Sequence, residues 1–258
     1  MNNTLVNGFR VLEYLAASGR DCSVKEIAGQ FKLPNSHACR LLKTLADTGY
    51  VIQTPGSRKY RIGLKILNLS CVKLASLELR NKARRNLRML ADHLGVIVYL
   101  TQVERGISII IDTEIPDNAF SPFPYVIGRM HPVNRSASGK LCAAYAEPEL
   151  LRELLKQCDY RKTASRSITG EAAFLRELRR IRRQGYSVLE SETREGIFAA
   201  SAPIFASGEL IGTVGAMLSE SPEPPAPERM RDLIRSLVDC GKKLSEYAED
   251  APGQAHPA

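Results

Sequence analysis

Hydrogen-bonding side chains recur at helical spacing between residues 35 and 47 of the chain. At about 100° per residue, they fall on the side of a helix opposite the apolar residues between Ala38 and Leu45. Side chains of these types pair with base edges in the major groove of B-DNA, which accepts one α-helix. The segment therefore predicts a helix that reads double-stranded DNA; a merely solvated polar face is the alternative. The predicted DNA-binding residues of this helix are Asn35, Ser36, His37, Arg40, Lys43 and Thr44.

A basic hairpin follows this helix. Residues 50–54 have the composition of a strand, Pro55-Gly56-Ser57 is a turn sequence, and residues 58–62 return as a second strand. Cations on such a hairpin can contact phosphates or enter the neighbouring minor groove. The predicted contacts are Arg58, Lys59 and Arg61.

Two further helices precede the donor-bearing one. Ser23 and Glu26 form a capping box that starts the second helix, and either Asn35 or Ser36 is expected to cap the third. Helix, helix, short turn, helix and basic hairpin occur in the order of a winged helix-turn-helix. The first helix, ending near residue 18, has an apolar stripe of Leu5, Phe9, Leu12 and Leu15.

The net charge of the chain is concentrated in the same region. The 258 residues carry 36 Lys and Arg against 28 Asp and Glu, a formal net charge of +8. Residues 1–75 hold 11 basic and 4 acidic side chains, a net +7, and the other 183 residues hold 25 and 24. This asymmetry favours a polyanionic partner for one end of the chain only.

Composition excludes several other classes of protein. A hydrophobic fraction of 44% with 25% charged residues is typical of a globular chain and not of a disordered one. No apolar run is long enough to cross a bilayer and the first residues lack a signal-peptide pattern, so we expect a cytoplasmic protein without a membrane partner. The six cysteines form no C-x-x-C pair and stand at no zinc-ligand spacing to histidine, which predicts reduced thiols and no metal.

A helical connector and an α+β domain are predicted beyond the hairpin. Residues 64–93 read as one long helix broken around Ala75–Glu78, whose apolar stripe needs a partner such as a second copy. Asn118–Tyr125 is expected to be a loop, Ser219–Pro227 is expected not to continue a sheet, and the residues from about Asp250 read as a frayed tail. Strands are expected at 96–103, 107–112 and 210–218, and helices at 147–157, 171–183 and from 230 onward.

Several segments resemble the IclR-type bacterial transcriptional regulators. The resemblance begins at Ser23–Ala28 and Leu33–Leu45, continues through residues 49–51, 59–63, 131–141 (HPVNRSASGKL) and 185–204, and covers about residues 5–245. It implies a winged helix-turn-helix at 1–64, a linker helix at 65–93, a GAF-like α/β effector-binding and oligomerisation domain with an antiparallel sheet at 94–247, and a disordered tail at 248–258. It also implies a homodimer or homotetramer that binds a palindromic operator and senses a small-molecule effector.

The resemblance further implies where that effector binds. A serine and a glycine at a helix start supply free N–H groups that suit a carboxylate, which agrees with the organic or aromatic acids that the family often senses. The simpler interpretation is that Gly139 only lets a helix start against the sheet. The implied effector-binding residues are Ser136, Ala137, Ser138, Gly139, Leu189, Glu190, Ile197, Ala199 and Gly215.

The chain departs from the family pattern within these motifs. Asn134 stands where the family usually has histidine, Arg135 where it has a small residue, and Ala199 where it often has cysteine. The family's aspartate falls on Leu189 or Glu190. Without the polar cysteine, the effector pocket should be drier. We therefore predict a bulkier or more apolar effector than a short keto acid. Arg135 is a candidate for pairing with an acidic effector, although such an arginine more often points to solvent.

Catalytic motifs are missing from the sequence. There is no G-x-S-x-G or H-E-x-x-H, and Ser138-Gly139-Lys140 fails as a P-loop because Asn134 replaces its first glycine and Leu141 its Ser/Thr. Glu190, Glu192 and Glu195 are expected to form a solvated acidic loop. We therefore predict no catalytic residue and no cofactor. An enzyme of small-molecule metabolism with an accessory DNA-binding head, and a constitutive DNA-binding protein, remain as alternatives.

Overall fold

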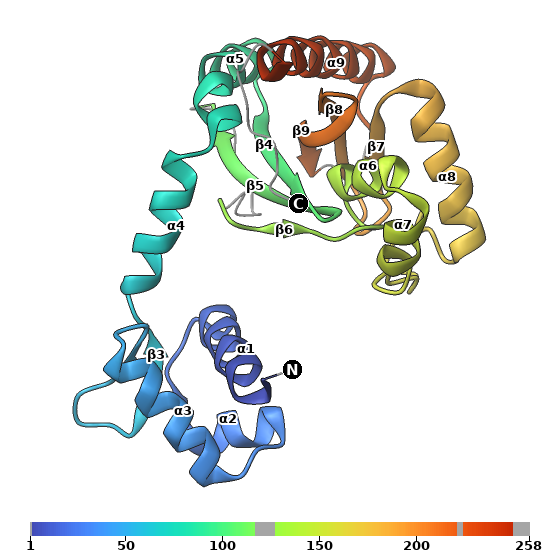
Figure 1. The fold of residues 1–258 in the computed structure, drawn as a ribbon. Helices are drawn as coiled ribbons and strands as arrows, with labels where there is room; N and C mark the ends of the chain where they lie inside the picture. The colour runs from blue at the N-terminus through green and yellow to red at the C-terminus, as the bar shows by residue number, and fades with distance from the viewer. Residues whose placement is uncertain (1, 117–126, 221–223, 250–258) are drawn as a thin grey trace. The chain divides into compact units, whose positions relative to one another are not determined.

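The computed structural model describes residues 2–116, 127–220 and 224–249, which form two compact units, Met1–Ser76 and Leu77–Ala258 (Figure 1). Each unit is a separate body here. The predicted loop Asn118–Tyr125 and the predicted tail from residue 250 lie outside the described residues. None of the described helices is long and apolar enough to span a membrane.

The first unit has the predicted order of helices and hairpin. Its small antiparallel sheet has the strand order β1-β3-β2, and the short strand β1, which pairs with β3, was not expected from the sequence. The elements are α1 (Asn3–Ser18), β1 (Cys22–Ser23), α2 (Val24–Phe31), α3 (Asn35–Asp47), β2 (Val51–Gln53), β3 (Lys59–Ile62) and α4 (Lys65–Ala75).

The capping box at the start of α2 is confirmed. The Glu26 backbone N–H donates to Ser23 Oγ at 3.2 Å, and the Ser23 backbone N–H donates to Glu26 Oε2 at 2.7 Å. That backbone donor, together with Arg20, lowers the pKa of Glu26 to about 2. The predicted side-chain cap of α3 is wrong. Pro34 occupies the N-cap position without a side-chain hydrogen bond, and Asn35 already lies inside the helix.

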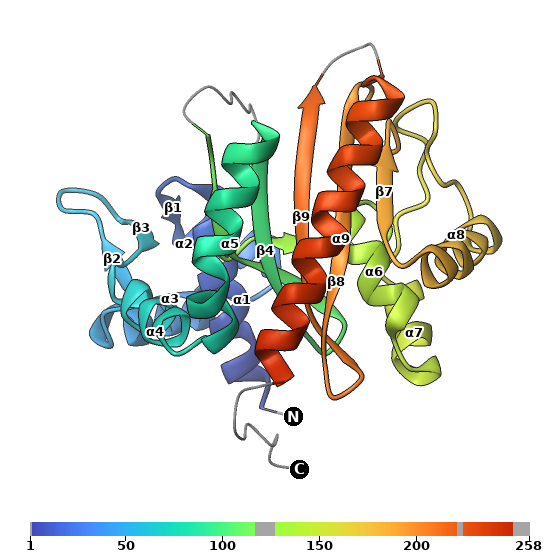
Figure 2. The same cartoon turned by 90° about the horizontal axis from the view of Figure 1, so that it is seen from above.

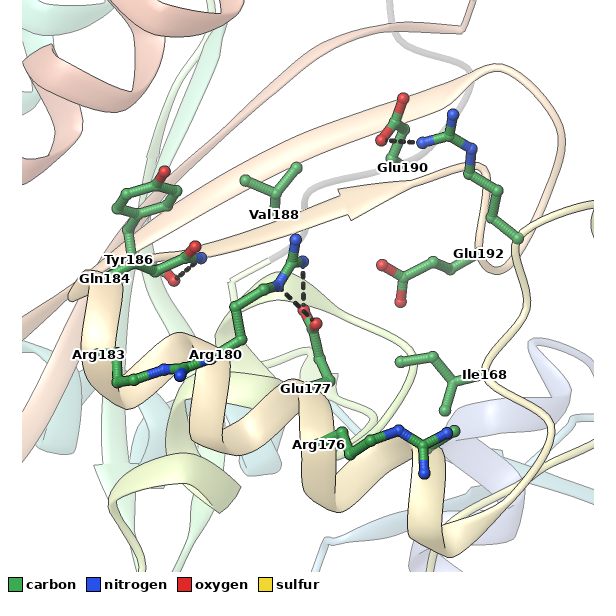
Figure 3. A pocket seen from close by; sticks show the side chains of 12 residues that line it. Ile168, Arg176, Glu177, Arg180, Arg183, Gln184, Tyr186, Val188, Glu190 and Glu192 are labelled. Carbon is green, nitrogen blue, oxygen red and sulfur yellow. Dashed lines mark hydrogen bonds and ion pairs between the residues drawn. The ribbon is translucent and has the colours of Figure 1, made fainter.

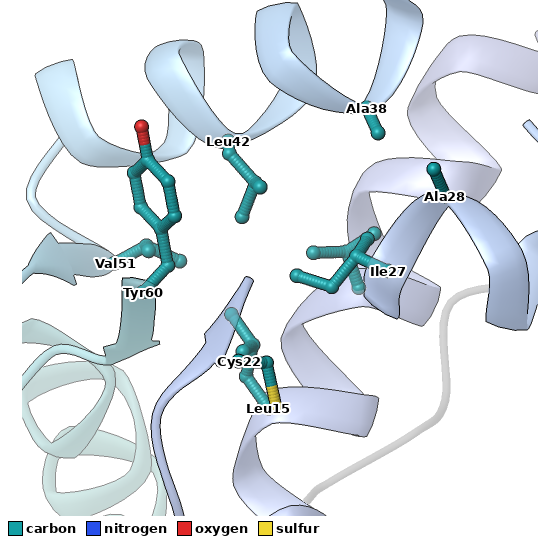
Figure 4. Close-up of a cluster of buried hydrophobic side chains, with 9 residues drawn as sticks. Leu15, Cys22, Ile27, Ala28, Ala38, Leu42, Val51 and Tyr60 are labelled. Carbon is teal, nitrogen blue, oxygen red and sulfur yellow. The ribbon is translucent and has the colours of Figure 1, made fainter. Parts of the chain in front are cut away.

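Helices α1, α2 and α3 and the small sheet enclose one apolar core that includes Leu15, Ile27, Leu42 and Tyr60 (Figure 4). The predicted stripe on α1 is only half right, because Leu5 and Phe9 are 59% and 58% exposed. The buried residues of α1 are Gly8, Val11 and Leu15, which recur at i, i+3 and i+7.

Helix α4 has no buried residue. Several large apolar side chains in and next to α4 are exposed to solvent. The predicted break in the connector lies at the two residues between α4 and the next helix. The exposed fractions are 78% for Leu64, 53% for Leu67, 55% for Leu69 and 65% for Val72.

The second unit is a six-stranded antiparallel sheet between helices, with strand order β6-β5-β4-β9-β8-β7. Helices α5 and α9 pack side by side on one face, and α6 packs on the other (Figure 2). Strand β9 includes Ser219 and Glu220, which pair with β8, so the prediction that the sheet stops before Ser219 is wrong. The elements are α5 (Glu78–Leu94), β4 (Ile97–Glu104), β5 (Ile107–Glu114), β6 (Met130–His131), α6 (Ala137–Tyr145), α7 (Pro148–Leu155), α8 (Glu171–Gln184), β7 (Ser187–Glu190), β8 (Ile197–Ala206), β9 (Glu209–Glu220) and α9 (Pro227–Glu249).

Candidate nucleic-acid interface and effector site

The outer face of α3 carries the predicted polar residues. Its inner face is anchored by Ala38 and Leu42, both 0% exposed, which fixes the rotation of the helix. His37 is only half-buried, and its Nε2 atom is buried with no hydrogen-bond partner among the described residues. The residues exposed on the outer face are Asn35, Ser36, Arg40, Lys43 and Thr44.

The hairpin β2–β3 presents its cations to solvent. Tyr60 is buried, and the alternation of side chains along β3 therefore turns Lys59 and Arg61 outward. Arg58 is also exposed, at the turn. The Thr54 N–H donates to the Lys59 carbonyl at 2.9 Å, and Gly56 adopts a φ of 70°, a backbone conformation that favours glycine in the turn. The wing is thus a closed hairpin with three exposed cations.

On the α6-facing side of the large sheet, one row of side chains crosses four strands. Tyr99 pairs with Gly215, Gly215 with Ser201, and Ser201 with Ser187. Directly paired residues of neighbouring strands project to the same face. A Cβ atom at Gly215 would overlap the ring of Tyr99, so the ring lies directly over this glycine. The three partners of Tyr99 in this row are small, and its ring packs over Gly215 beneath α6.

A chain of buried hydroxyl groups links this row to α6. Ser138 Oγ lies 3.1 Å from Ser201 Oγ, accepts from Thr213 Oγ1 at 2.8 Å, and donates to the Tyr99 hydroxyl at 3.5 Å. Burial raises the pKa of Tyr99 to about 12, against the opposing effect of its serine neighbours. Burial likewise lowers the pKa of His131 to about 4. The His131 ring packs edge-on against Tyr99, with 5.1 Å between the ring centroids. Both rings are therefore uncharged at neutral pH.

Four of the predicted effector residues form one apolar cluster beside this row. Ala137, Leu189 and Ala199 are buried together, and Ile197 packs against them. Glu190 does not join them, because alternate residues of a strand point to opposite sides. Its carboxylate instead forms an ion pair with Arg166. The predicted set is thus divided between the two sides of β7.

The start of α6 explains the serine and glycine of its motif. Ser136 Oγ accepts from the Gly139 N–H at 3.0 Å and donates to the Pro132 carbonyl at 2.7 Å. A Cβ atom at Gly139 would overlap that same carbonyl oxygen, so the close approach requires glycine. In the described structure the N–H groups of Ala137 and Ser138, in the first turn, have no acceptor.

Lys140 is a buried cation that the sequence reasoning missed. It is 0% exposed, and its Nζ donates to the Val188 carbonyl and to Glu192, both at 2.6 Å, with Glu177 at 3.4 Å. The expectation of a solvated acidic loop is therefore wrong for Glu192, whose side chain is 11% exposed and whose pKa is raised by burial. Apart from its place in the S-G-K motif, no sequence signal predicted the burial of Lys140.

Asn134 and Arg135, which depart from the family pattern, both bind the segment at Asp159. Asn134 Nδ2 donates to the Asp159 carbonyl at 2.8 Å, and Arg135 pairs with the Asp159 carboxylate at 2.6 Å. Hydrogen bonds from Arg161, together with Arg135, hold the pKa of Asp159 well below its usual range. The Arg135 side chain is only 20% exposed, so the expectation that it points to solvent is corrected. Its pairing with an acidic effector stays a prediction.

Comparison with known sequences identifies the family. The model of the family described as bacterial transcriptional regulator IclR C-terminal matches residues 71–246, and the IclR helix-turn-helix domain matches residues 4–55. The chain belongs to the IclR family. IclR-family chains are transcriptional regulators with a DNA-binding helix-turn-helix and a C-terminal effector-binding domain, and this chain has both.

Similar proteins cover nearly the whole IclR chain. The HTH-type transcriptional regulator KdgR of Escherichia coli is 27% identical over 246 residues, which are 94% of this chain and 91% of that one. A crystal structure of an IclR transcriptional regulator from Alicyclobacillus acidocaldarius superposes with a TM-score of 0.80 at 23% identity, covering 96% of this chain and 99% of that one. An IclR homolog from Microbacterium hydrocarbonoxydans, complexed with 4-hydroxybenzoate, has a TM-score of 0.74 at 20% identity and covers 95% and 99%.

These comparisons bear on the enzyme alternative as well. The relatives named above are regulators, and nothing in them supports a catalytic domain with an accessory DNA-binding head. The chain is a transcriptional regulator. Within the described residues, no group of three or more His, Cys, Asp or Glu side chains could hold a metal ion.

Proposed function

We propose that α3 enters the major groove of a specific operator and that the wing contacts the flanking phosphates. The observation that carries this proposal is the joint exposure, within one compact unit, of the polar face of α3 and the cations of the wing. Base contacts then supply sequence choice, and phosphate contacts supply affinity. The regulator acts in the cytoplasm, where it meets this DNA. Footprinting on genomic fragments selected by the protein tests the proposal, because a chain that protects no fragment contradicts it.

We also propose that the regulator binds a palindromic operator as a homodimer or homotetramer, with α4 in the interface between copies. Support comes from the apolar side chains that α4 leaves in solvent, since contiguous exposed apolar surface marks an interaction site. Replacing Leu67 by glutamate should weaken self-association by about tenfold or more, because burying one leucine contributes about 1.5–3 kcal/mol. Sedimentation equilibrium measures this change.

Asn68→Glu is the matched control, because it adds the same charge at the next, exposed position of α4. It should leave the association constant nearly unchanged. Equal masses for all three proteins across the concentration series would remove α4 from the interface.

For the effector, we propose a small organic or aromatic acid bound between α6 and the sheet. The acceptor-free N–H groups at the start of α6 suit a carboxylate, because a helix N-terminus carries partial positive charge. The apolar cluster of Ala137, Leu189, Ile197 and Ala199 suits a ring. A structural neighbour holds 4-hydroxybenzoate, an acid of this kind. Unequal affinity of the acid for two arrangements of the regulator would shift operator occupancy.

A bulky side chain in that cluster should block the acid. A thermal-shift screen of organic and aromatic acids, beginning with 4-hydroxybenzoate, should find a compound that stabilises the wild-type protein. Ala199→Ile should then weaken its binding by about tenfold or more, since overpacking costs roughly 1–3 kcal/mol. Calorimetry measures the affinity. The control Glu190→Gln changes the neighbouring strand residue that points away and should bind normally; a larger loss in this control than in Ala199→Ile would contradict the site.

A further inference from the structure

A groove of about 650 Å³ lies between α8 and the outer edge of β7 (Figure 3). Tyr186, Val188, Glu190 and Glu192, which alternate along and beyond β7, form one wall, and Arg166 also lines the groove. Leu189 projects from β7 to the other side, into the apolar cluster under α6. The groove is therefore separate from the proposed effector site.

Arginine side chains dominate the helical wall of this groove. Arg176, Arg180 and Arg183 recur at i, i+4 and i+7 on α8, so they form one stripe along the groove, and Arg166 is a fourth arginine of its lining. Arg180 is occupied by Glu177, with two hydrogen bonds of 2.9 Å. Within the described part of the chain, Arg176 and Arg183 have no carboxylate partner. Two guanidinium groups are thus left to attract an anion.

The carboxylates of the groove are already compensated. Glu190 pairs with Arg166, and Glu192 pairs with the buried Lys140. Glu177 is shared between Arg180 and Lys140; burial opposes its ionisation, but the hydrogen bonds of Arg180 and the charge of Lys140 lower its pKa. The four arginines and Lys140 against three glutamates leave a net charge of +2.

The free edge of β7 is closed to another strand. Lys140 Nζ donates to the outward carbonyl of Val188 at 2.6 Å, and Gln184 Nε2 donates to that of Tyr186 at 2.7 Å. A peptide that adds to a sheet edge needs such carbonyls as acceptors. The occupant that fits is therefore a small molecule. The volume lies within the range of small-molecule sites and exceeds that of a bare phosphate ion.

We propose that this groove binds a small organic molecule carrying a phosphate or more than one carboxylate, with Arg176 and Arg183 as its principal charge partners. Guanidinium groups bind both kinds of oxyanion in bidentate geometry. The apolar parts of Ile168 and Val188 line the same space and can contact a carbon skeleton. The site gives the regulator a second ligand input, apart from the one under α6.

Isothermal titration of the full chain with glucose 6-phosphate, citrate and inorganic phosphate tests the proposal. At least one of the first two should bind, and the comparison between them separates phosphate from carboxylate as the recognised group. Arg176→Gln and Arg183→Gln should each weaken that binding by about tenfold, the effect expected for loss of one charged hydrogen-bond partner. Inorganic phosphate should bind more weakly, because it lacks the carbon skeleton.

Arg179→Gln is the matched control on the same helix, because Arg179 is exposed and does not line the groove. It removes the same charge and should bind like the wild type, as should Ala199→Ile in the effector cluster. Loss of binding in Ala199→Ile alone would assign the ligand to the effector site and overturn the groove. Three other results would also overturn the groove as a binding site. They are equal losses of binding in all three arginine variants, no binding of either organic anion, and an effect of the variants on DNA affinity only.

Discussion

Replacement of both Arg40 and Lys43 by alanine is expected to lower operator affinity by roughly 100-fold or more. A good bidentate contact to a base is worth about 1–3 kcal/mol, a phosphate contact adds to it, and a dimer loses each contact twice. Both side chains are exposed on the outer face of α3, so the fold should remain intact. Fluorescence anisotropy with a selected operator fragment measures the loss, and circular dichroism checks the fold.

The salt dependence of binding separates the two contacts. A phosphate contact at Lys43 predicts a salt slope reduced by about one per contact, whereas a base contact at Arg40 predicts relaxed sequence preference with little change in slope. The control protein Lys162→Ala/Arg179→Ala loses the same two charges from exposed positions of the other unit. If that control loses as much affinity as the α3 variant, net charge and not α3 explains the binding.

Replacement of Lys140 by alanine is expected to destabilise the second unit by about 3–5 kcal/mol, the cost of leaving a buried ion pair with one partner missing. Glu192 would keep a buried carboxylate without its cation, and the Val188 carbonyl would lose its donor. Urea denaturation followed by circular dichroism measures the free energy of unfolding. Adding Glu192→Gln to the same chain should recover part of the loss, because the unpaired charge is then removed.

Lys156→Ala is the control for Lys140→Ala, because both lysines have the same distance to a glutamate but differ in burial. Lys156 Nζ lies 2.6 Å from Glu153, as Lys140 Nζ lies 2.6 Å from Glu192, but the Lys156 side chain is 69% exposed. An exposed pair is worth about 0–1 kcal/mol, so the free energy of unfolding should barely change. Similar small effects of the two substitutions would show that burial of Lys140 does not govern this site.

Local signals predicted the first unit well. The capping box at Ser23 and the turn at Pro55-Gly56-Ser57 depend on neighbours in the sequence, and both are confirmed. The stripe on α1 is predicted only in part, because several apolar side chains surround that helix and periodicity alone does not select which of them meet the core. Leu5 and Phe9 satisfied the spacing as well as the buried residues did.

The second unit shows what short-range patterns miss. Lys140 meets Glu177 and Glu192 only because the chain brings α6, α8 and the segment after β7 together, so no spacing announces their ion pairs. Leu189 and Glu190 are neighbours in the sequence, yet a strand sends them to opposite sides. The resemblance located the segments of the effector site, but the register of β7 decides which residues belong to it.

The ring of Tyr99 occupies the space that a side chain at Gly215 would need. We therefore expect the two positions to vary together: a relative with alanine or serine in place of Gly215 should carry a smaller or differently directed residue in place of Tyr99. Exchange of bulk between adjacent strands would change the packing between α6 and the sheet while leaving the sheet intact. Sensors for differently shaped metabolites could then diverge through paired substitutions at these two positions.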